Sequence, residues 1–369
     1  MDKVYQIAVF VSDHGFGHGT RTCSVLKEIV KLVTCELTIF SNLPSWFFDQ
    51  NLGKATKFKH YQFKVDIGLI QNGPFIHDVK KTIKLLIEFL EFKSCEVENI
   101  EEICCKQSHD LIISDISPLG IHLADKLNIP SVLVENFTWE WIYEEYRKEF
   151  PDIEFVIMLM KRIYERVNLR IQATPFCNKI SSAIPVPPIS RKLKEKPYEI
   201  KKKLGIPIFS KVFLITTGGI FKKVYSADKM AKHEDCTFIC SSEEPEIRHE
   251  KNLISLPLKS EIHYPDLVNT SDLVVGKVGY GTLAECWLTD TPLLGCFREN
   301  FRESHILQEY ANKHLHSHEL SVDEFEKMNW IERAIDILEI SKREKLLSKV
   351  NGAEVAAQSI AKFISKINR

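Results

Sequence analysis

Two histidines four residues apart begin the part of this sequence that is best suited to chemistry. They stand in the stretch SDHGFGHGTRT, Ser12–Thr22, directly after the apolar run Ile7–Val11. A histidine can take up and release a proton near neutral pH, and glycines let a backbone approach a ligand closely. The glycines disfavour a helix across both histidines, which a metal site on one helix face would need. We therefore expect a functional loop followed by a helix that begins near Thr20, with a plain turn and a metal site as the alternatives.

An aspartate follows a second apolar run, Leu111–Ser114. A carboxylate at the carboxyl end of a parallel strand lies at the edge of the sheet where ligands bind. Such a carboxylate can fix the tautomer of a histidine and stabilise the imidazolium that forms when the histidine takes a proton. The pattern predicts His18 as a general base, Asp115 as its partner and His14 as the second choice for the base. The alternative for Asp115 is that it only caps the following helix.

Two glycine turns in the second half of the chain are suited to holding a diphosphate. One is TTGG at Thr216–Gly219, and the other is GKVGYGTLAE at Gly276–Glu285. Backbone N–H groups at a helix start bind phosphate, and a carboxylate one turn into the helix can reach a ribose diol. We expect this helix to begin at Thr282, so that Glu285 is either a ribose ligand or the second member of a capping box. A plain strand-to-helix turn is the alternative for the first glycine turn.

Apolar runs alternate with amphipathic segments along most of the chain, which predicts parallel sheets covered by helices. The expected strands are Gln6–Val11, Glu36–Ser41, Leu111–Ser114, Ser131–Glu135, Val212–Thr216, Thr237–Cys240, Leu253–Leu256, Leu273–Gly276 and Leu293–Phe297. The expected helices are Thr20–Lys31, His77–Cys105, Leu119–Leu127, Thr282–Leu288, Glu303–Lys313 and Ala353–Ile367.

A proline-rich stretch from Thr174 to Pro197 interrupts this alternation and is typical of a linker. A chain of 369 residues also exceeds the usual size of one core. We expect an α/β protein with a domain at 1–185, a second at 186–345, and a helix within 346–369 that packs back on the first. Each domain should be a doubly wound, Rossmann-like sheet, and the two should face each other across a cleft.

Composition narrows the class of protein. A net charge of −1 argues against a nucleic-acid binder, and no apolar stretch is long enough for a transmembrane helix. The ten cysteines form no CxxC pair, which favours reduced thiols and a cytoplasmic protein. His314, His316 and His318 lack a spacing that completes a metal site, so no metal is expected.

Within the aromatic run Phe137–Tyr143, packing of Trp139 and Tyr143 in an interdomain core is favoured over stacking on a sugar.

Taken together, these motifs resemble those of the GT-B glycosyltransferases, and most of all the glycosyltransferase-like N-terminal half of L-arabinokinases. The matching segments are HGFGHGTR at His14–Arg21, DLIISDISP at Asp110–Pro118, NFTWEWIYEEY at Asn136–Tyr146, DLVVGKVGYGTLAE at Asp272–Glu285 and FRENFRE at Phe297–Glu303. The resemblance runs from about Val4 to about Lys313. Gly19 stands where that family more often has alanine. L-arabinokinases continue into a sugar-kinase domain, whereas this sequence ends at Arg369, so kinase activity is not expected.

The resemblance implies that the C-terminal domain holds a nucleotide sugar. The implied donor residues are Gly218, Gly219, Leu258, Lys277, Gly279, Tyr280, Gly281, Thr282, Glu285, Arg298 and Glu303. Within this set, Gly279–Thr282 would face the diphosphate, Glu285 the ribose, Leu258 the base and Glu303 the sugar hydroxyls. The implied acceptor residues, in the N-terminal domain, are Phe16, Arg21 and Trp139.

The expected activity is that of a cytoplasmic, inverting, metal-independent hexosyltransferase. Its partners would be a nucleotide sugar, expected to be a UDP-sugar, and an acceptor that the sequence does not identify, with no further cofactor. One alternative is a UDP-sugar 2-epimerase, which needs no acceptor. The other is a nucleotide-sugar-binding module without catalysis.

Overall fold

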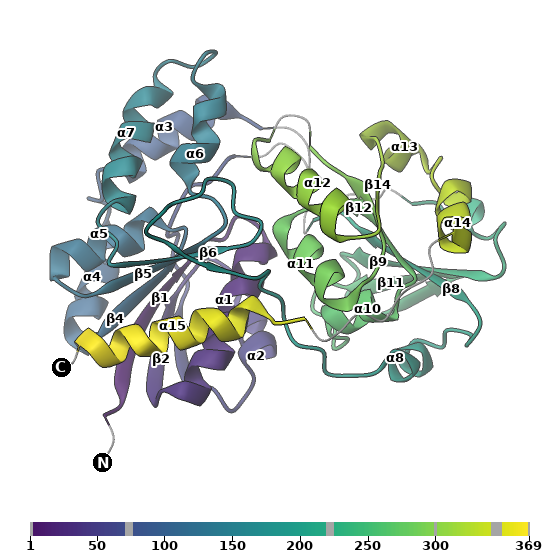
Figure 1. The fold of residues 1–369 in the computed structure, drawn as a ribbon, viewed down its shortest axis with the longest axis horizontal. Coiled ribbons are helices and arrows are strands. Elements are labelled where there is room, and N and C mark those ends of the chain that lie inside the picture. Colours follow the sequence, from purple (N-terminus) through teal and green to yellow (C-terminus); the bar gives the residue numbers. More distant parts are fainter. Residues whose placement is uncertain (1–2, 71–76, 219–224, 299–300, 341–348, 368–369) are drawn as a thin grey trace. The chain divides into compact units, whose positions relative to one another are not determined.

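The computed structural model describes residues 3–70, 77–218, 225–298, 301–340 and 349–367. The chain forms two compact units (Figure 1). The first comprises Met1–Ser190, Phe301–Glu303 and Val350–Arg369, and the second comprises Arg191–Asn300 and Ser304–Lys349. Both chain ends therefore belong to the first unit. Among the described helices, none has both the length and the apolar character needed to cross a membrane.

The first unit is built on a seven-stranded parallel sheet in the order β3-β2-β1-β4-β5-β6-β7. Its strands are β1 Tyr5–Val11, β2 Cys35–Phe40, β3 Phe58–Tyr61, β4 Leu111–Asp115, β5 Ser131–Glu135, β6 Leu169–Ala173 and β7 Ile184–Val186. Its helices are α1 Phe16–Leu32, α2 Ser45–Leu52, α3 Val79–Phe89, α4 Cys95–Gln107, α5 Pro118–Leu127, α6 Trp139–Tyr143, α7 Ile153–Tyr164 and α15 Gly352–Ile367. This strand order reverses direction between β1 and β4, which is the switch point of a doubly wound sheet.

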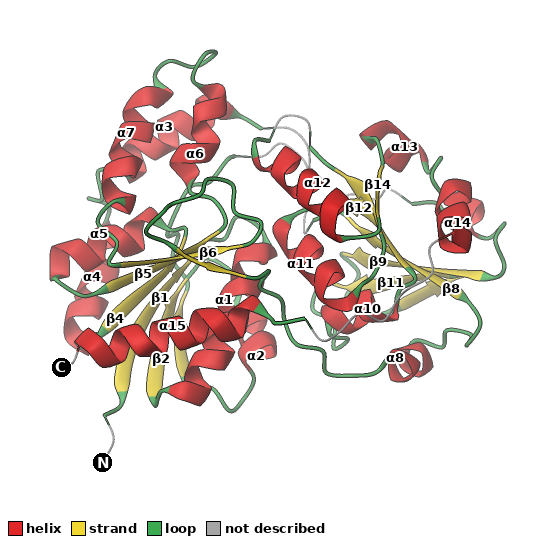
Figure 2. Ribbon diagram, in the orientation of Figure 1, coloured by secondary structure: helices red, strands yellow, loops and turns green. Residues whose placement is uncertain are grey.

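Helices cover the sheet of the first unit because its central strands are apolar on both faces (Figure 2). Ala8 and Phe10 of β1 pack with Val97 of α4 and Leu119 of α5 in one core cluster. The crossover from β1 to β2 runs in the opposite direction along the sheet to the one from β4 to β5, which places α1 on the other face. The last helix, α15, packs along α1.

The second unit repeats this design in the order β10-β11-β9-β8-β12-β13-β14. Its strands are β8 Lys211–Thr216, β9 Cys236–Ser242, β10 Arg248–Glu250, β11 Leu253–Pro257, β12 Leu273–Lys277, β13 Leu293–Cys296 and β14 Ser317–Glu319. Its helices are α8 Pro197–Lys203, α9 Ala227–Met230, α10 Tyr264–Thr270, α11 Tyr280–Thr289, α12 Glu303–His314, α13 Val322–Lys327 and α14 Ile331–Ile340. The first residue of α12, Glu303, belongs to the first unit. All pairs are parallel except β10 with β11, at one edge.

The predicted class, an α/β protein with doubly wound Rossmann-like sheets, is confirmed. All nine expected strands are present within two residues of their predicted bounds. The prediction of one helix over His77–Cys105 was wrong, because the chain breaks between α3 and α4, where Phe92 has a φ of 52°. The stretch Thr174–Pro197 is not linker throughout, since it contains β7, which completes the first sheet. No disulfide joins the ten cysteines, all of which lie within the described residues.

Candidate functional site

The helix that follows the histidine loop begins earlier than the sequence predicted. It begins at Phe16 rather than Thr20, with Gly15 as N-cap at a φ of 84°, a left-handed backbone that favours glycine. His18 therefore lies in the first turn of α1. A Cβ on Gly19 would lie 2.5 Å from the ring of Phe47, so this glycine serves the packing of α1 against α2. Close helix packing explains a glycine that propensity alone would count against the helix.

His18 and Asp115 meet at the carboxyl edge of the first sheet. β1 and β4 are neighbours with Val11 opposite Asp115, so the loop after β1 begins beside the end of β4. The Nδ1 atom of His18 lies 2.8 Å from Oδ1 of Asp115, and both side chains are buried. Nη2 of Arg21, which can only donate, also lies 3.1 Å from this Nδ1. In the tautomer with the proton on Nδ1, the ring donates to the carboxylate and keeps its lone pair on Nε2, the form that a general base requires. The predicted alternative, that Asp115 caps α5, does not apply, because Ser117 is the N-cap.

Arg21 binds the same carboxylate from the next turn of α1. Its Nε donates to Oδ2 of Asp115 at 2.8 Å and its Nη2 to Oδ1 at 2.6 Å, while the Thr22 hydroxyl donates to Oδ2 at 2.9 Å. Burial acts to raise the pKa of Asp115, but the charge and hydrogen bonds of Arg21 and the bond from His18 lower it to about 2. Asp115 is therefore an ionised, fully bonded group that orients His18 and is not itself a proton acceptor at neutral pH.

The bonds of Arg21 continue to two further buried residues of the first unit. Its Nη1 donates to Oδ1 of Asn136 at 2.5 Å, and Nδ2 of Asn136 donates to Oε2 of Glu303 at 3.1 Å. Arg21 is 2% exposed, and its side chain donates to buried groups of the protein. Its contact with an acceptor stays a prediction. Glu303, expected on the donor side, belongs to the first unit in this structure.

A second buried carboxyl, Asp66, lies near His18 and was missed from the sequence. It follows β3, a short strand that the sequence pattern did not reveal, in a loop without a recognisable motif. Oδ2 accepts from Nε1 of Trp139 at 3.1 Å, whereas Oδ1 has no hydrogen-bond partner among the described residues. Burial and then repulsion by Asp13 raise the pKa of Asp66 to about 6, against hydrogen bonds from Ser12 and Trp139.

Trp139 packs in the interior of the first unit next to Asp66. Its side chain is 0% exposed and stacks on Tyr143 at 5.8 Å, and the Tyr143 hydroxyl donates to the carbonyl of Gly68 at 2.8 Å. The predicted packing of Trp139 with Tyr143 is therefore found, but inside the first unit. The Trp139 ring is buried in this structure, and its contact with an acceptor stays a prediction.

Phe16, expected on the acceptor side, and His14, the second choice for the base, are both half-buried. The ring of His14 meets that of Trp139 edge-on at 4.9 Å, and the ring of Phe16 stacks on Phe47 at 5.2 Å. His14 precedes α1, so it does not share a helix face with His18. Over the described part of the chain, no three side chains of histidine, cysteine, aspartate or glutamate lie together as a metal site.

In the second unit, α11 begins directly after β12, at Tyr280. The expected start at Thr282 and the capping box with Glu285 were wrong, because Gly279 is the N-cap and Glu285 lies beyond the first turn. Gly279 has a φ of −122°, which any residue adopts, and a Cβ there would meet no described atom within 4 Å. Nothing in the described fold requires a glycine here, which is consistent with close approach of a ligand to the N–H groups of Gly281 and Thr282.

Glu285 is held by an arginine from the start of the second unit. Its Oε1 accepts from Nε of Arg191 at 3.1 Å and from Nη2 at 2.7 Å. The carboxylate is 4% exposed, and burial raises its pKa although Arg191 opposes this. Sequence reasoning could not find Arg191, because it lies 94 residues away with no motif around it.

The two glycine turns of the second unit lie against each other. Gly218 has a φ of 71°, and a Cβ on it would lie 2.8 Å from Cδ of the buried Lys277. Gly219 falls outside the described residues. Leu258, after β11, is 46% exposed, and Arg298, after β13, is half-buried. The structure thus brings Gly218 and Lys277 into contact and leaves Leu258 partly exposed.

No family model matches the chain. It is 24% identical over 361 residues to an L-arabinokinase of Arabidopsis thaliana, covering 95% of this chain and 33% of that protein. The chain thus spans about a third of the length of the curated relative it matches.

The whole chain resembles a number of solved structures, two of which follow. One is a UDP-glucosyltransferase from Polygonum tinctorium capable of glucosylating indoxyl, with a TM-score of 0.62, 11% identity and 99% of each chain covered. The other is a candidate UDP-N-acetylglucosamine 2-epimerase from Listeria monocytogenes, with a TM-score of 0.60, 12% identity, and 100% of this chain and 97% of that one covered. At these identities the likeness establishes the fold.

Proposed function

We propose that this chain, which has the GT-B fold, is an inverting glycosyltransferase. Its donor is a nucleoside-diphosphate sugar, expected to be a UDP-sugar, and its acceptor carries a hydroxyl group. The observation that carries the proposal is the buried pair of His18 and Asp115, 2.8 Å apart at the carboxyl edge of the first sheet. Such a pair is suited to removing a proton from a hydroxyl group.

The reaction is a single displacement. The acceptor oxygen attacks the anomeric carbon of the donor and forms the new C–O bond, while its proton passes to Nε2 of His18. The bond from the anomeric carbon to the diphosphate oxygen breaks, and the diphosphate leaves with the electron pair. Asp115 stabilises the imidazolium through Nδ1–H, and Arg21 keeps Asp115 ionised throughout.

The donor groups of the second unit fit the leaving diphosphate. α11 is ten residues long, and its first N–H groups carry partial positive charge that favours an anion. Lys277 lies beside the Gly218 turn and can add a positive charge. These groups stabilise the charge that develops on the diphosphate, so we propose that turnover needs no metal ion.

The test is His18→Ala, assayed with a panel of nucleotide sugars and acceptors. General-base catalysis is worth about 10²–10⁴ in rate, so kcat should fall by that order while the donor Kd stays unchanged. The matched control is His249→Ala, on the exposed edge strand β10, which should retain full kcat. Near-full turnover in His18→Ala would show that the loop binds through its backbone and that the base lies elsewhere. A loss confined to His14→Ala would assign the base to His14.

The likeness to a candidate UDP-N-acetylglucosamine 2-epimerase supports a second candidate function. An epimerase forms product from the nucleotide sugar alone, whereas a transferase needs an acceptor. Incubation with UDP-N-acetylglucosamine without acceptor, followed by separation of the two epimers, therefore distinguishes the reactions. Tight binding of nucleotide sugar without turnover under either condition would instead identify a binding module.

A further inference from the structure

A turn on the second unit exposes two large apolar side chains. Pro207, Ile208, Phe209 and Ser210 form a β-turn in which the N–H of Ser210 donates to the carbonyl of Pro207 at 3.1 Å. The two central residues are Ile208, 79% exposed, and Phe209, 96% exposed. Central turn positions are normally held by glycine, asparagine, aspartate, serine or proline. Two adjacent apolar side chains in solvent at such a corner are not explained by the fold of the unit.

The turn is fixed on the surface by buried neighbours. Ile206 and Ser210, on either side of it, are buried, and the Ser210 hydroxyl hydrogen-bonds that of Thr237 at 2.7 Å. Nζ of Lys201, in α8, donates to the carbonyls of Ile208 at 2.9 Å and Ser210 at 3.1 Å. The exposed side chains of Ile208 and Phe209 are therefore held out from the surface by a bonded backbone.

The chain around this turn is strongly basic. Between Lys192 and Lys211 the sequence has seven lysines and two glutamates, although the whole chain has a net charge of −1. The exposed lysines are Lys192, Lys194, Lys196, Lys202 and Lys203. Glu195 pairs with Lys203 at 2.5 Å, and Glu199 accepts from the backbone N–H of Lys196 and from the hydroxyl of Tyr198. Lys211 pairs with Asp235 at 3.4 Å. The segment itself keeps an excess of positive charge, with five exposed lysines against two glutamates.

Further apolar surface lies on the same segment. Tyr198 on α8 is 64% exposed, and Leu193, in the irregular segment before α8, is 40% exposed. In Figure 1, α8 and the chain that leads from it to β8 run along one edge of the second unit. A rigid apolar projection among lysines matches the interface of a bilayer with anionic lipids, where apolar groups enter between headgroups and lysines face phosphates and carboxylates.

We infer that the basic turn segment, residues 192–211, is a docking surface for the anionic face of a lipid bilayer. Ile208 and Phe209 enter the headgroup region, and the exposed lysines bind anionic headgroups. A protein partner is the less suitable occupant, because the two apolar side chains project from the surface and do not line a hollow. Docking of this kind is reversible and adds to the proposed transferase activity without depending on it.

The experiment is sedimentation of the full chain with vesicles. Phosphatidylcholine vesicles with and without phosphatidylserine are compared, for wild type, Ile208→Ser/Phe209→Ser and Lys196→Gln/Lys202→Gln. We expect binding to the anionic vesicles and little to the neutral ones. The apolar double variant should bind at least about tenfold less tightly, and each lost lysine should cost about fivefold. Raising the salt from about 0.1 M to about 1 M should release the protein, because the Debye length falls from ~10 to ~3 Å.

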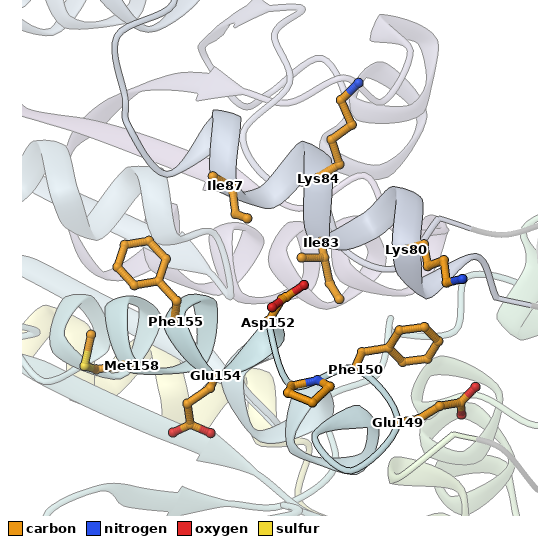
Figure 3. Close-up of a pocket in the computed structure, with 11 residues that line it drawn as sticks. Lys80, Ile83, Lys84, Ile87, Glu149, Phe150, Asp152, Glu154, Phe155 and Met158 are labelled. Atoms are coloured by element: carbon orange, nitrogen blue, oxygen red, sulfur yellow. The ribbon is translucent and has the colours of Figure 1, made fainter.

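A matched control comes from the first unit. Figure 3 shows Ile83 and Ile87 of α3 and Phe155 and Met158 of α7 lining a groove together with charged side chains, and Phe155 is 51% exposed. Phe155→Ser removes an exposed phenylalanine without touching the basic turn segment, so its vesicle binding should equal that of wild type. Thermal melting of all variants checks that the fold is retained. A Phe209→Trp variant should show extra quenching by brominated lipids over the wild-type protein.

Three results would overturn the inference. They are no binding to anionic vesicles at low salt, equal binding of Ile208→Ser/Phe209→Ser and wild type, and no added quenching at position 209. If the apolar double variant instead turned a lipid-free oligomer into a monomer, as measured by light scattering, the segment would be a contact between copies of this chain. None of these outcomes bears on the His18 test of the proposed function.

Discussion

Replacing Asp115 by asparagine tests the arrangement at the centre of the candidate site. The carboxylate accepts two bonds from Arg21, one from Thr22 and one from His18. An amide of the same size keeps one acceptor oxygen but turns its NH₂ group towards other donors. Arg21, 2% exposed, would then be buried without its counter-charge.

The loss in the free energy of unfolding that this substitution causes can be worked out in two ways. A carboxyl with a folded-state pKa of about 2 against an ordinary value of ~3.9 gains roughly 2–3 kcal/mol from its charged state at neutral pH. Breaking a buried ion pair by removing one partner costs about 3–5 kcal/mol, because the other charge is left buried. The second estimate includes the stranded Arg21, so we expect about 3–5 kcal/mol. For a unit of about 200 residues this lowers Tm by roughly 6–20 °C.

Differential scanning calorimetry suits a chain of two units because it can separate their transitions. The matched control is Asp125→Asn in α5, whose carboxylate is 44% exposed and pairs with Arg166, a side chain that is 57% exposed. Surface pairs contribute about 0–1 kcal/mol, so this control should barely shift Tm. Equal shifts in Asp115→Asn and Asp125→Asn would refute the buried pair.

The pH dependence of the same comparison follows from the lowered pKa of Asp115. A group whose folded-state pKa is lowered stabilises the protein fully above its unfolded-state pKa and loses this effect as pH falls through the folded-state value. The difference in Tm between wild type and Asp115→Asn should stay constant from about pH 8 to about pH 5 and become smaller below about pH 4. A gap that narrows as pH rises from 7 would contradict this account.

Four further predictions concern the donor groups and Asp66. UDP at about 100 times its Kd should stabilise the protein by ~2.7 kcal/mol, and UMP at the same concentration by less, in a thermal-shift assay; equal shifts would argue against a diphosphate site. Glu285→Ala should weaken nucleotide-sugar affinity about ten- to a hundredfold by calorimetric titration, and the loss should persist in Arg191→Ala/Glu285→Ala. A purely structural Glu285 predicts reduced stability with unchanged affinity. EDTA should leave turnover intact, and activity lost on chelation and restored by Mg²⁺ or Mn²⁺ would refute the metal-free mechanism. Asp66 has a raised folded-state pKa, so it favours folding below its unfolded-state pKa and loses this as pH rises through about 6. The Tm of Asp66→Asn relative to wild type should therefore be higher above pH 6 than at pH 4. A difference in Tm that is the same at pH 4 and pH 8 would contradict the raised pKa of Asp66.

The amino-acid sequence determined the scaffold and the position of its loops. Apolar runs such as Ile7–Val11 and Leu111–Ser114 indicate strands that are buried on both faces. This signal lies within each run and does not depend on distant residues. Because both strands are parallel and end at one edge, the meeting of His18 with Asp115 followed from topology, and the structure places them 2.8 Å apart. Their catalytic roles stay predictions.

Tertiary structure decided which side chains face each other across the sequence. Asp66 lies beside Trp139, and Glu285 beside Arg191, at separations of 73 and 94 residues. Such contacts depend on how helices and loops pack and on the side-chain rotamers that packing permits, and periodicity carries no record of either. The run Ile206–Phe209 is apolar throughout, yet only folding shows that Ile206 is buried and Phe209 stands in solvent. The hydropathy of a residue determines whether its burial stabilises the protein. The packing of the folded chain determines whether that residue is in fact buried.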